Sequence, residues 1–550
     1  MPNRALSIAI VIFAITFMGC HKEEQHSYPT LPSLHLTMTS KQLDSILADR
    51  DNKVSAFAVL VDSDGDTLYE GELTHIKTRG NTSFKEEKKP FVIKFPQKHT
   101  LFGLEKNKSF VLLANACDES HIRNAIGLDL ARAIGIPAPH YAYLTLYING
   151  SYKGLYQMTN KIDVGRRALD ITNLNDLNKQ ANPKPLHDYD WYGHGRKKQV
   201  ILRKGILLKR NPDDITGGYL LDNTGDNSFY SKSIGGFVSD ADDNIQIRSP
   251  KYASQQEVDY IAGLYNEMEK AIHAPDGVNP ETGKHYSEYI DVKSFARYYL
   301  LNEILYNIDG GWASFMMYKD TDSIDPKIYA GPAWDYDRTL DNPHFQQRYL
   351  MITNELYTNK RQGKIGLAHS GGLLFHICKH TDFQHVVKTT YINEVGPACH
   401  SYLAENTIDS LFHCLCQEAD RDNSLHGDRF SADYEAATKS AMDFLTKRIE
   451  FFDWYFSSNE RVHATYKDIN EKTRNFYFPI GEAIHAPQLE KLCNRTPVYE
   501  LFYAGTDSIV PDGIVFHASQ ELELRKRQPT KHEVQMRRIK KKLAKFGIKI

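Results

Sequence analysis

Two groups of residues in this 550-residue chain have side chains suited to binding phosphate and a metal ion. The first group is acidic: Asp309 precedes a Gly-rich turn, and Asp335 and Asp337 alternate within the segment 334–337. In an extended segment, alternate residues point to the same side, so both carboxylates would face one way. Such carboxylates repel each other unless a cation lies between them, and Mg²⁺ takes oxygen ligands of this kind together with substrate phosphates. Taken alone, the pattern more readily indicates that Asp337 caps a turn and pairs with Arg338.

The second group is basic and lies early in the chain. Arg79 and Gly80 belong to the run 77–83, which leads to Lys88, Lys89 and Lys94. Glycine lets a backbone approach a ligand closely, and Arg79 with Lys94 would hold phosphate oxygens. Without other support, solvated lysines at the start of a strand are the simpler interpretation.

Common catalytic motifs are absent from the sequence. It contains no GxxxxGK[ST], HExxH or GxSxG, so P-loop hydrolysis, zincin chemistry and α/β-hydrolase acyl transfer lose their usual support.

Local patterns predict the elements that must position these groups. Ile122, Ile126 and Leu130 repeat at four-residue steps and predict a helix over 120–134. Ser254 and Glu257 form a capping box at the start of another helix. Further predicted elements are a hairpin turning at Asn149-Gly150, a helix from about 291 to 307, strands at 218–221, 313–319 and 327–330, and mostly helix over 373–456. The chain is therefore predicted to be an α+β protein with a largely helical C-terminal half.

Eight short motifs in order resemble the CotH kinase family, the spore-coat protein H type of secreted atypical kinases. The resemblance covers residues 47–456. The matching residues are Arg79-Gly80-Asn81-Thr82-Ser83 with Lys89 and Lys94; Leu113-Ala114-Asn115; Asp118 with Ile122-Arg123-Asn124; Tyr147-Ile148-Asn149-Gly150-Ser151-Tyr152-Lys153-Gly154-Leu155-Tyr156; Gly217-Gly218-Tyr219-Leu220-Leu221; Asn307-Ile308-Asp309; Tyr318-Lys319-Asp320; and Trp334-Asp335-Tyr336-Asp337.

The resemblance implies a divergent protein-kinase-like fold that transfers the γ-phosphoryl group of ATP to Ser or Thr of exported proteins. By position, Asp309 corresponds to the catalytic aspartate that orients the substrate hydroxyl and accepts its proton. Asp335 and Asp337 correspond to the segment that binds Mg²⁺ or another divalent cation. Phosphoryl transfer of this kind depends on a metal, positioned oxygens and cationic neutralisation.

The resemblance also assigns the remaining site residues. Arg79 and Lys94 fall where phosphate contacts are expected, and Trp334 would pack on the adenine of ATP. Ser314 stands near a position where family members often carry Asn, and its hydroxyl would ligate the metal more weakly. Asn160 replaces an acidic residue, and both departures support an alternative: a catalytically weak or inactive scaffold that binds an envelope glycan or protein. Phosphoryl transfer to a sugar is a third alternative, which the sequence does not separate from the first.

The N-terminus predicts export. Arg4 precedes a short apolar core over 5–15, and Gly19-Cys20 ends a segment that resembles a bacterial lipoprotein signal. This implies cleavage before Cys20 and acylation of its thiol; an uncleaved anchor is the alternative. The charged tract 21–24 resembles those that direct Gram-negative lipoproteins to the surface. We therefore expect a lipid-anchored protein in the cell envelope, at the outer membrane or cell surface.

Charge and composition set the remaining boundaries. The segment 525–550 carries eleven Lys or Arg and one acidic residue, which leaves 56 basic and 68 acidic residues elsewhere, so nucleic acid is not an expected partner. This basic tail is predicted either to lie on anionic lipid or polysaccharide or, more simply, to be a solvated terminus. The predicted division is a signal peptide 1–20, a linker 21–46, the kinase-like domain 47–456, a small β module 460–524 and the basic tail 525–550. The cysteines after Cys20 are expected to be buried thiols, although export permits disulfides.

Overall fold

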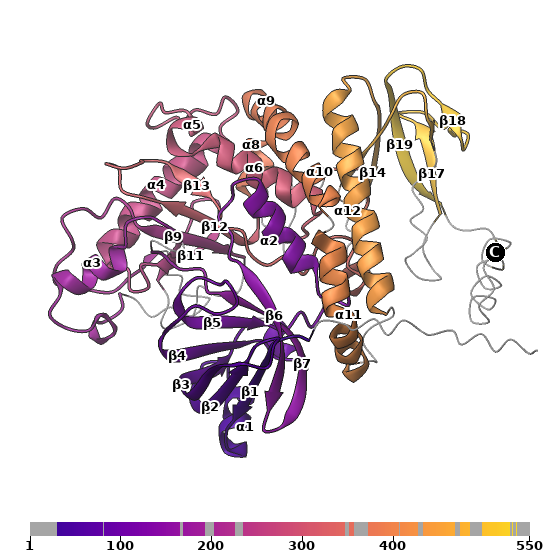
Figure 1. The fold of residues 1–550 in the computed structure, drawn as a ribbon. Helices are drawn as coiled ribbons and strands as arrows, with labels where there is room; N and C mark the ends of the chain where they lie inside the picture. The colour runs from indigo at the N-terminus through magenta and orange to yellow at the C-terminus, as the bar shows by residue number, and fades with distance from the viewer. Residues whose placement is uncertain are drawn as a thin grey trace, which may run out of the picture.

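The computed structural model describes residues 30–80, 82–165, 169–192, 203–225, 235–346, 351–356, 372–405, 407–426, 433–467, 473–484 and 498–527, with Lys531 and Gln535. The predicted signal peptide, Cys20 and most of the basic tail lie outside the described residues. The described part is a mixed α+β protein (Figure 1).

The N-terminal part is a closed β-barrel, at the bottom of Figure 1, with the strand order β1-β2-β3-β4-β5-β7-β6. Its interior is an apolar cluster that includes Leu34, Ile76, Ile93 and Phe110, and Ile46 of helix α1 packs against it. The elements are β1 (Ser33–Thr37), α1 (Ser40–Ala48), β2 (Val54–Val61), β3 (Thr67–Thr78), β4 (Phe91–His99), β5 (Asn107–Leu113), β6 (Tyr141–Ile148) and β7 (Ser151–Asn160).

Part of the predicted linker 21–46 belongs to this barrel. Strand β1 pairs antiparallel with β2 and parallel with β6, and α1 begins within the same range. Leu34 and Leu36 alternate with exposed residues and are buried in the barrel interior. The alternation gives β1 one apolar face, and β1 closes the barrel by pairing with both β2 and β6.

A second, six-stranded sheet follows in the order β13-β12-β9-β11-β10-β8. Helices α4 (Gln255–His273) and α6 (Val292–Ile304) contribute to the apolar core on one face of this sheet, together with Tyr219 and Leu221 of β9. Since side chains alternate along a strand, the other face carries Leu220 and Asp222. The strands are β8 (Arg203–Lys204), β9 (Tyr219–Thr224), β10 (Gly236–Val238), β11 (Asn244–Ser249), β12 (Ala313–Lys319) and β13 (Ile328–Ala330).

Helix α2 (Arg123–Ala133) lies between the barrel and the helical half, and α11 lies beside β7 (Figure 1). Tyr143 and Leu155, on the outside of the barrel, belong to the same apolar core as α2 and α4. The predicted helical character of 373–456 is confirmed for its described residues. The remaining helices are α3 (Leu174–Ala181), α5 (Tyr286–Tyr289), α7 (Pro343–Gln346), α8 (Leu373–Ile377), α9 (Thr381–Thr390), α10 (Gly396–Ala404), α11 (Thr407–Leu425) and α12 (Tyr434–Ser457).

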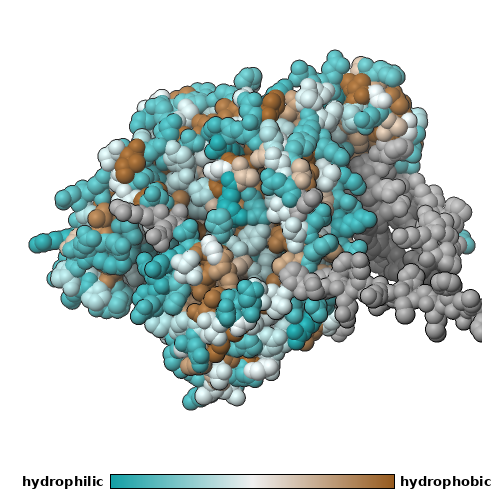
Figure 2. Space-filling view, in the orientation of Figure 1, coloured by the Kyte–Doolittle hydropathy of each residue, from teal (hydrophilic) through white to brown (hydrophobic). Residues whose placement is uncertain are grey.

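The C-terminal module consists of a four-stranded sheet, β15-β14-β19-β17, and the pair β16-β18 among the described residues. On the face drawn in Figure 2, apolar side chains are mostly scattered among hydrophilic ones, with a group on this module, where Ile509 and Val515 are exposed. The last strand of the C-terminal module, β19, includes residues 525–527, which the sequence analysis assigned to the basic tail. The strands are β14 (Val462–Lys467), β15 (Thr473–Phe478), β16 (Ala483–Ile484), β17 (Val498–Tyr503), β18 (Ile514–Val515) and β19 (Gln520–Arg527).

Two further features concern the helices and the cysteines. Within the described ranges, every helix is too short or too polar to cross a bilayer. Cys117, Cys378 and Cys399 are buried as predicted, whereas Cys414 and Cys416 are half-buried, and no disulfide joins the described cysteines to one another.

Candidate active site

Asp309 lies in the turn after helix α6. Its backbone N–H donates a hydrogen bond to Oδ1 of Asn307 at 3.0 Å. Its carboxylate Oδ2 lies 3.4 Å from Nη1 of Arg338, and both side chains are largely buried. Arg338 therefore pairs with Asp309, whereas the simpler sequence interpretation paired it with Asp337. The ion pair brings Asp309 to the segment that carries the other two aspartates.

Asp335 is exposed and does not lie in an extended segment. Its φ angle is +72°, in the left-handed region, so the alternation expected for a strand does not describe this segment. Ser314, at a β-bulge in β12 with a φ of +54°, donates a hydrogen bond from Oγ to Oδ2 of Asp335 at 3.1 Å. The structure thus joins these two predicted metal ligands by a direct contact.

Asp337 is half-buried and interacts electrostatically with both other aspartates. Burial, with the negative charges of Asp335 and Asp309, raises the pKa of Asp337 to about 8, and Arg338 opposes the rise. A carboxylate with two like charges nearby resists ionisation. Residues far apart in the chain therefore converge, and we call Asp309, Asp335 and Asp337 the carboxylate site.

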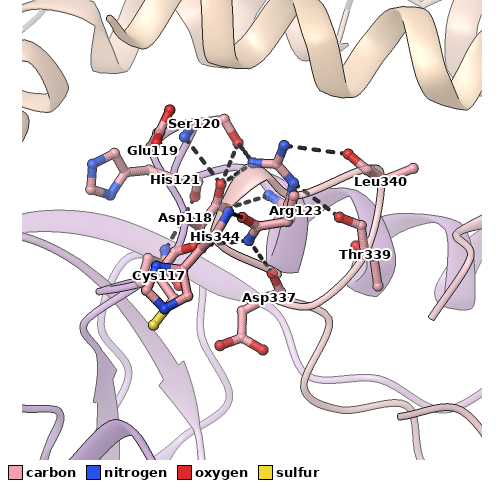
Figure 3. Close-up of polar contacts among 12 residues, drawn as sticks. Cys117, Asp118, Glu119, Ser120, His121, Arg123, Asp337, Thr339, Leu340 and His344 are labelled. Atoms are coloured by element: carbon pink, nitrogen blue, oxygen red, sulfur yellow. Dashed lines mark hydrogen bonds and ion pairs between the residues drawn. The ribbon is translucent and has the colours of Figure 1, made fainter. Parts of the chain in front are cut away.

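A buried ion pair next to helix α2 holds the Asp337 segment in place (Figure 3). Arg123 is fully buried and pairs with Asp118. Its Nε donates to the carbonyl of Thr339 at 3.1 Å and its Nη2 to the carbonyl of Leu340 at 3.3 Å. Guanidinium donors in a fixed geometry restrict the backbone that they bind. Asp118 and Arg123 stood in the matching motifs, and the structure assigns them a positioning role.

A second contact fixes the residue between the two aspartates. Oδ1 of Asn124 accepts a hydrogen bond from the backbone N–H of Tyr336 at 2.7 Å. The Tyr336 ring packs so closely on α2 that a Cβ on Gly127 would lie 2.3 Å from its Cγ. Position 127 requires glycine because any side chain there would collide with the Tyr336 ring.

Arg79, at the end of β3, faces the carboxylate site from the barrel. Its guanidinium carbon lies 5.4 Å from the centre of the Trp334 ring. Burial lowers the pKa of Arg79, while the negative charge of Asp335 raises it and the positive charge of Arg248 lowers it. Burial also lowers the pKa of Lys161, which interacts with Arg248 and Arg79. Three cations thus interact with one another: Arg79 just after β3, Lys161 just after β7 and Arg248 in β11; of these, Arg79 interacts with Asp335.

Lys94 lies on the outer face of the barrel. It pairs with His75 in the β3–β4 ladder, while its neighbours Ile93 and Phe95 fill the interior. In the described part of the chain, no hydrogen bond or ion pair joins Lys94 to the carboxylate site. Its predicted phosphate contact remains a prediction, and Lys161 is the lysine that the structure groups with Arg79.

Sequence reasoning missed Asp222 in β9. Its side chain is 2% exposed, and Oδ2 accepts hydrogen bonds from Nε and Nη2 of Arg248 at 2.9 and 2.6 Å. Burial raises the pKa of Asp222, Arg248 lowers it, and the nearby charge of Asp335 raises it. A carboxylate directly after the apolar run Tyr219-Leu220-Leu221 was the available signal, because acids are almost never buried without a partner.

A comparison with protein-family models matches residues 76–452 to the family described as CotH kinase protein. The chain belongs to the CotH kinase family. No curated protein matches the chain significantly.

Membership of the CotH kinase family makes ATP and a divalent cation the ligands to test against the site. Among the residues described, no three His, Cys, Asp or Glu side chains form a ready-made metal cluster. Mg²⁺ commonly binds one or two carboxylates and completes its shell with phosphate oxygens and water. The repulsion that raises the pKa of Asp337 is the interaction that a cation would relieve. The carboxylate site therefore fits a cation bound together with a nucleotide.

An apolar cluster adjoins the carboxylate site of this CotH protein. Trp334 packs with residues from the segment after β7, from β9 and from β12. The cluster consists of Ile162, Val164, Leu169, Ile171, Leu220, Met316, Tyr318 and Trp334. The cluster places apolar and aromatic side chains beside the carboxylate site.

Asn160, one of the two departures from the family pattern, has a structural partner here. Its Nδ2 donates to the carbonyl of Glu105, and its Oδ1 accepts from the N–H of Glu105, each at 2.9 Å. A carboxylate could accept but not donate. Asn160 therefore holds the loop before β5 to the end of β7.

Proposed function

We propose that the protein transfers the γ-phosphoryl group of ATP, with Mg²⁺ or another divalent cation, to a Ser or Thr hydroxyl of an exported protein. Family membership supports a kinase-like protein. The observation that carries the proposal is the convergence of Asp309, Asp335 and Asp337 opposite Arg79. Acidic groups would bind the cation, and basic groups would neutralise the phosphates.

In this proposal each side chain has one task. Asp309, oriented by Arg338, positions the acceptor hydroxyl and takes its proton. Asp335 and Asp337, with Ser314, hold the divalent cation, which supplies charge neutralisation at the phosphates when bound. Arg79 and Lys94 contact phosphate oxygens, and Trp334 packs on the adenine within the apolar cluster.

The experiment is phosphoryl transfer with labelled ATP and Mg²⁺, using purified protein and a co-exported fraction. Wild type should label itself or a partner, and Asp335→Asn should lose most of the labelling. Asp64→Asn, which changes an exposed aspartate in the β2–β3 turn, is the matched control and should label normally. Equal labelling by Asp335→Asn and wild type would refute the metal assignment.

A binding scaffold for an envelope glycan or protein is the second candidate. The contact between Ser314 and Oδ2 of Asp335 favours it, because this hydrogen bond satisfies part of the acceptor capacity of the carboxylate within the protein itself. Thermal melting with nucleotides and divalent ions separates the two candidates. No shift of the melting temperature with any nucleotide, in a folded protein, would favour the scaffold.

We also propose that the protein is anchored through an acylated Cys20 in the cell envelope, with an exported protein as its substrate. The Gly19-Cys20 ending of the apolar N-terminal segment supports this. Replacing Cys20 by Ser should move the protein from the membrane fraction to the soluble exported fraction. Retention of the variant in the membrane fraction would favour an uncleaved anchor instead.

A further inference from the structure

Two buried polar side chains lie side by side on the face of the six-stranded sheet opposite α4 and α6. Asp222 of β9 and Gln246 of β11 are register partners in the antiparallel ladder. Directly paired residues project their side chains to the same face at close distance. Both residues are almost completely buried, with exposures of 2% and 3%.

Each of these side chains has an oxygen that receives no hydrogen bond from the described part of the chain. They are Oδ1 of Asp222 and Oε1 of Gln246. Oδ2 of Asp222 already accepts two hydrogen bonds from Arg248, which holds the carboxylate in one orientation. A buried acceptor without a donor destabilises a fold, and it needs an explanation such as a bound water, ion or ligand. The two adjacent acceptors would be satisfied by a molecule that offers hydroxyl donors.

The position of this pair matches one part of a nucleotide. Along the same face of β9, Leu220 belongs to the apolar cluster with Trp334, and Asp222 follows two residues later. Asp222 also interacts with Asp335, beside Ser314. Along β9 the order is thus Leu220 of the apolar cluster, then Asp222, then the end of the strand that pairs with β12 beside Ser314; Met316 of the cluster is the partner of Asp222 on β12. A nucleotide presents its groups in the same order: base, ribose and phosphates.

We propose that Asp222 and Gln246 accept hydrogen bonds from the ribose hydroxyls of the bound nucleotide, so that the site selects ribonucleotides over deoxyribonucleotides. The inference rests on the proposed function, because it requires a nucleotide between the apolar cluster and the carboxylate site. Arg248 positions Asp222 and leaves Oδ1 for the ligand. A site built to hydrogen-bond a hydroxyl rejects an analogue that lacks it, because its buried acceptor then stays unsatisfied.

The test is calorimetric binding of ATP, 2′-deoxy-ATP and 3′-deoxy-ATP, each with Mg²⁺, to the full chain. Wild type should bind ATP about tenfold to a hundredfold more tightly than at least one deoxy analogue, as expected for a hydrogen bond to a charged acceptor. Asp222→Asn and Gln246→Met should bind ATP more weakly and lose most of the discrimination. Gln256→Met, an exposed change on α4, should retain the wild-type pattern.

The melting temperature without nucleotide gives a second readout. Gln246→Met removes an unsatisfied acceptor, so its melting temperature should equal or exceed that of wild type; a structural role would lower it instead. Equal affinities of wild type for ATP and both deoxy analogues would overturn this inference and leave the proposed function standing. No binding of any nucleotide would overturn both.

Discussion

At the scale of single residues, the carboxylate site depends on three aspartates with different surroundings. Asp309 forms an ion pair with Arg338. Asp335 is exposed and accepts a hydrogen bond from Ser314, and Asp337 is half-buried with a raised pKa. Different surroundings give chemically identical carboxylates different pKa values, and so allow them different roles. In the proposed function, Asp309 acts on the acceptor hydroxyl and the other two share a cation.

Asp309→Asn tests the role of the predicted base. The amide keeps the size of the side chain but cannot accept a proton, so the transfer rate should fall about 10²-fold to 10⁴-fold. ATP affinity should stay within about twofold, because the change leaves Asp335 and Asp337 intact. Single-turnover transfer and calorimetric binding measure the two quantities separately. A normal rate, or a loss of binding as large as the loss of rate, would contradict the assignment.

At the scale of elements, helix α2 is the support of the site. Arg123 and Asn124, at its first turn, bind the backbone of the segment that carries Asp335 and Asp337. Removing one partner of a buried ion pair leaves an uncompensated charge, which is strongly destabilising.

Arg123→Met should therefore lower the free energy of unfolding by about 3–5 kcal/mol, because Asp118 is left buried and charged. Urea denaturation measures the change. Lys179→Met, which breaks the exposed pair with Asp176 on α3, is the control and should cost at most about 1 kcal/mol. Similar losses in the two variants would show that the buried pair has no special role.

The N-terminus of α4 should make stability depend on pH. Burial raises the pKa of Glu257 to about 7 from an ordinary value near 4.5, although its Oε2 accepts from Ser254 N and Asn178 Nδ2. Between these values the folded state binds a proton that the unfolded state has lost, so stability should fall as the pH rises from about 4.5 to 7.

Glu257→Gln removes this ionisation and keeps the acceptor for the cap. The variant should be about 1–3 kcal/mol more stable than wild type at pH 8 and close to wild type at pH 5. Urea unfolding at the two pH values measures the difference. If the stability of the variant relative to wild type is no greater at pH 8 than at pH 5, folding does not raise the pKa of Glu257.

At the scale of the whole molecule, helix α11 joins the barrel to the loop that supports the site. Asp422 of α11 is buried and lies 2.6 Å from Nζ of Lys88 and 3.4 Å from Nε2 of His121. Its neighbour Asn423 donates to the carbonyl of Glu119 at 2.9 Å. A Cβ on Gly154 would lie 2.0 Å from Oδ1 of Asp422, which explains why the matching motif 147–156 has glycine at this position. The loop held by α11 carries Asp118, so the connection reaches the carboxylate site.

Asp422→Asn should lower the free energy of unfolding by about 3–5 kcal/mol, because Lys88 is left buried without its counter-charge. Hydrogen exchange should increase in α11 and β7. Glu418→Gln on the same helix, which alters the more exposed contact with Tyr152, is the control and should cost about 1 kcal/mol or less. Unchanged exchange in β7 for Asp422→Asn would mean that the ion pair does not couple α11 to the barrel.

The amino-acid sequence by itself determined the local elements and the motif residues of the site. The capping box of Ser254 and Glu257 forms as predicted, and Asn149 and Gly150 adopt the positive φ angles of 51° and 77° that a tight hairpin needs. These features depend on residues within a few positions of one another, so a local pattern suffices. The order of the eight motifs was sufficient to indicate the family.

Only the tertiary structure decided which side chains meet. Lys88 and Asp422 are 334 residues apart, and Asp222 acquired a place at the site because β9 lies between β11 and β12. The left-handed backbone of Asp335 and the inclusion of β1 in the barrel also depend on distant partners. Contacts between remote segments leave no periodic pattern in the sequence, because these contacts depend on how the barrel, the sheet and the helices pack against one another.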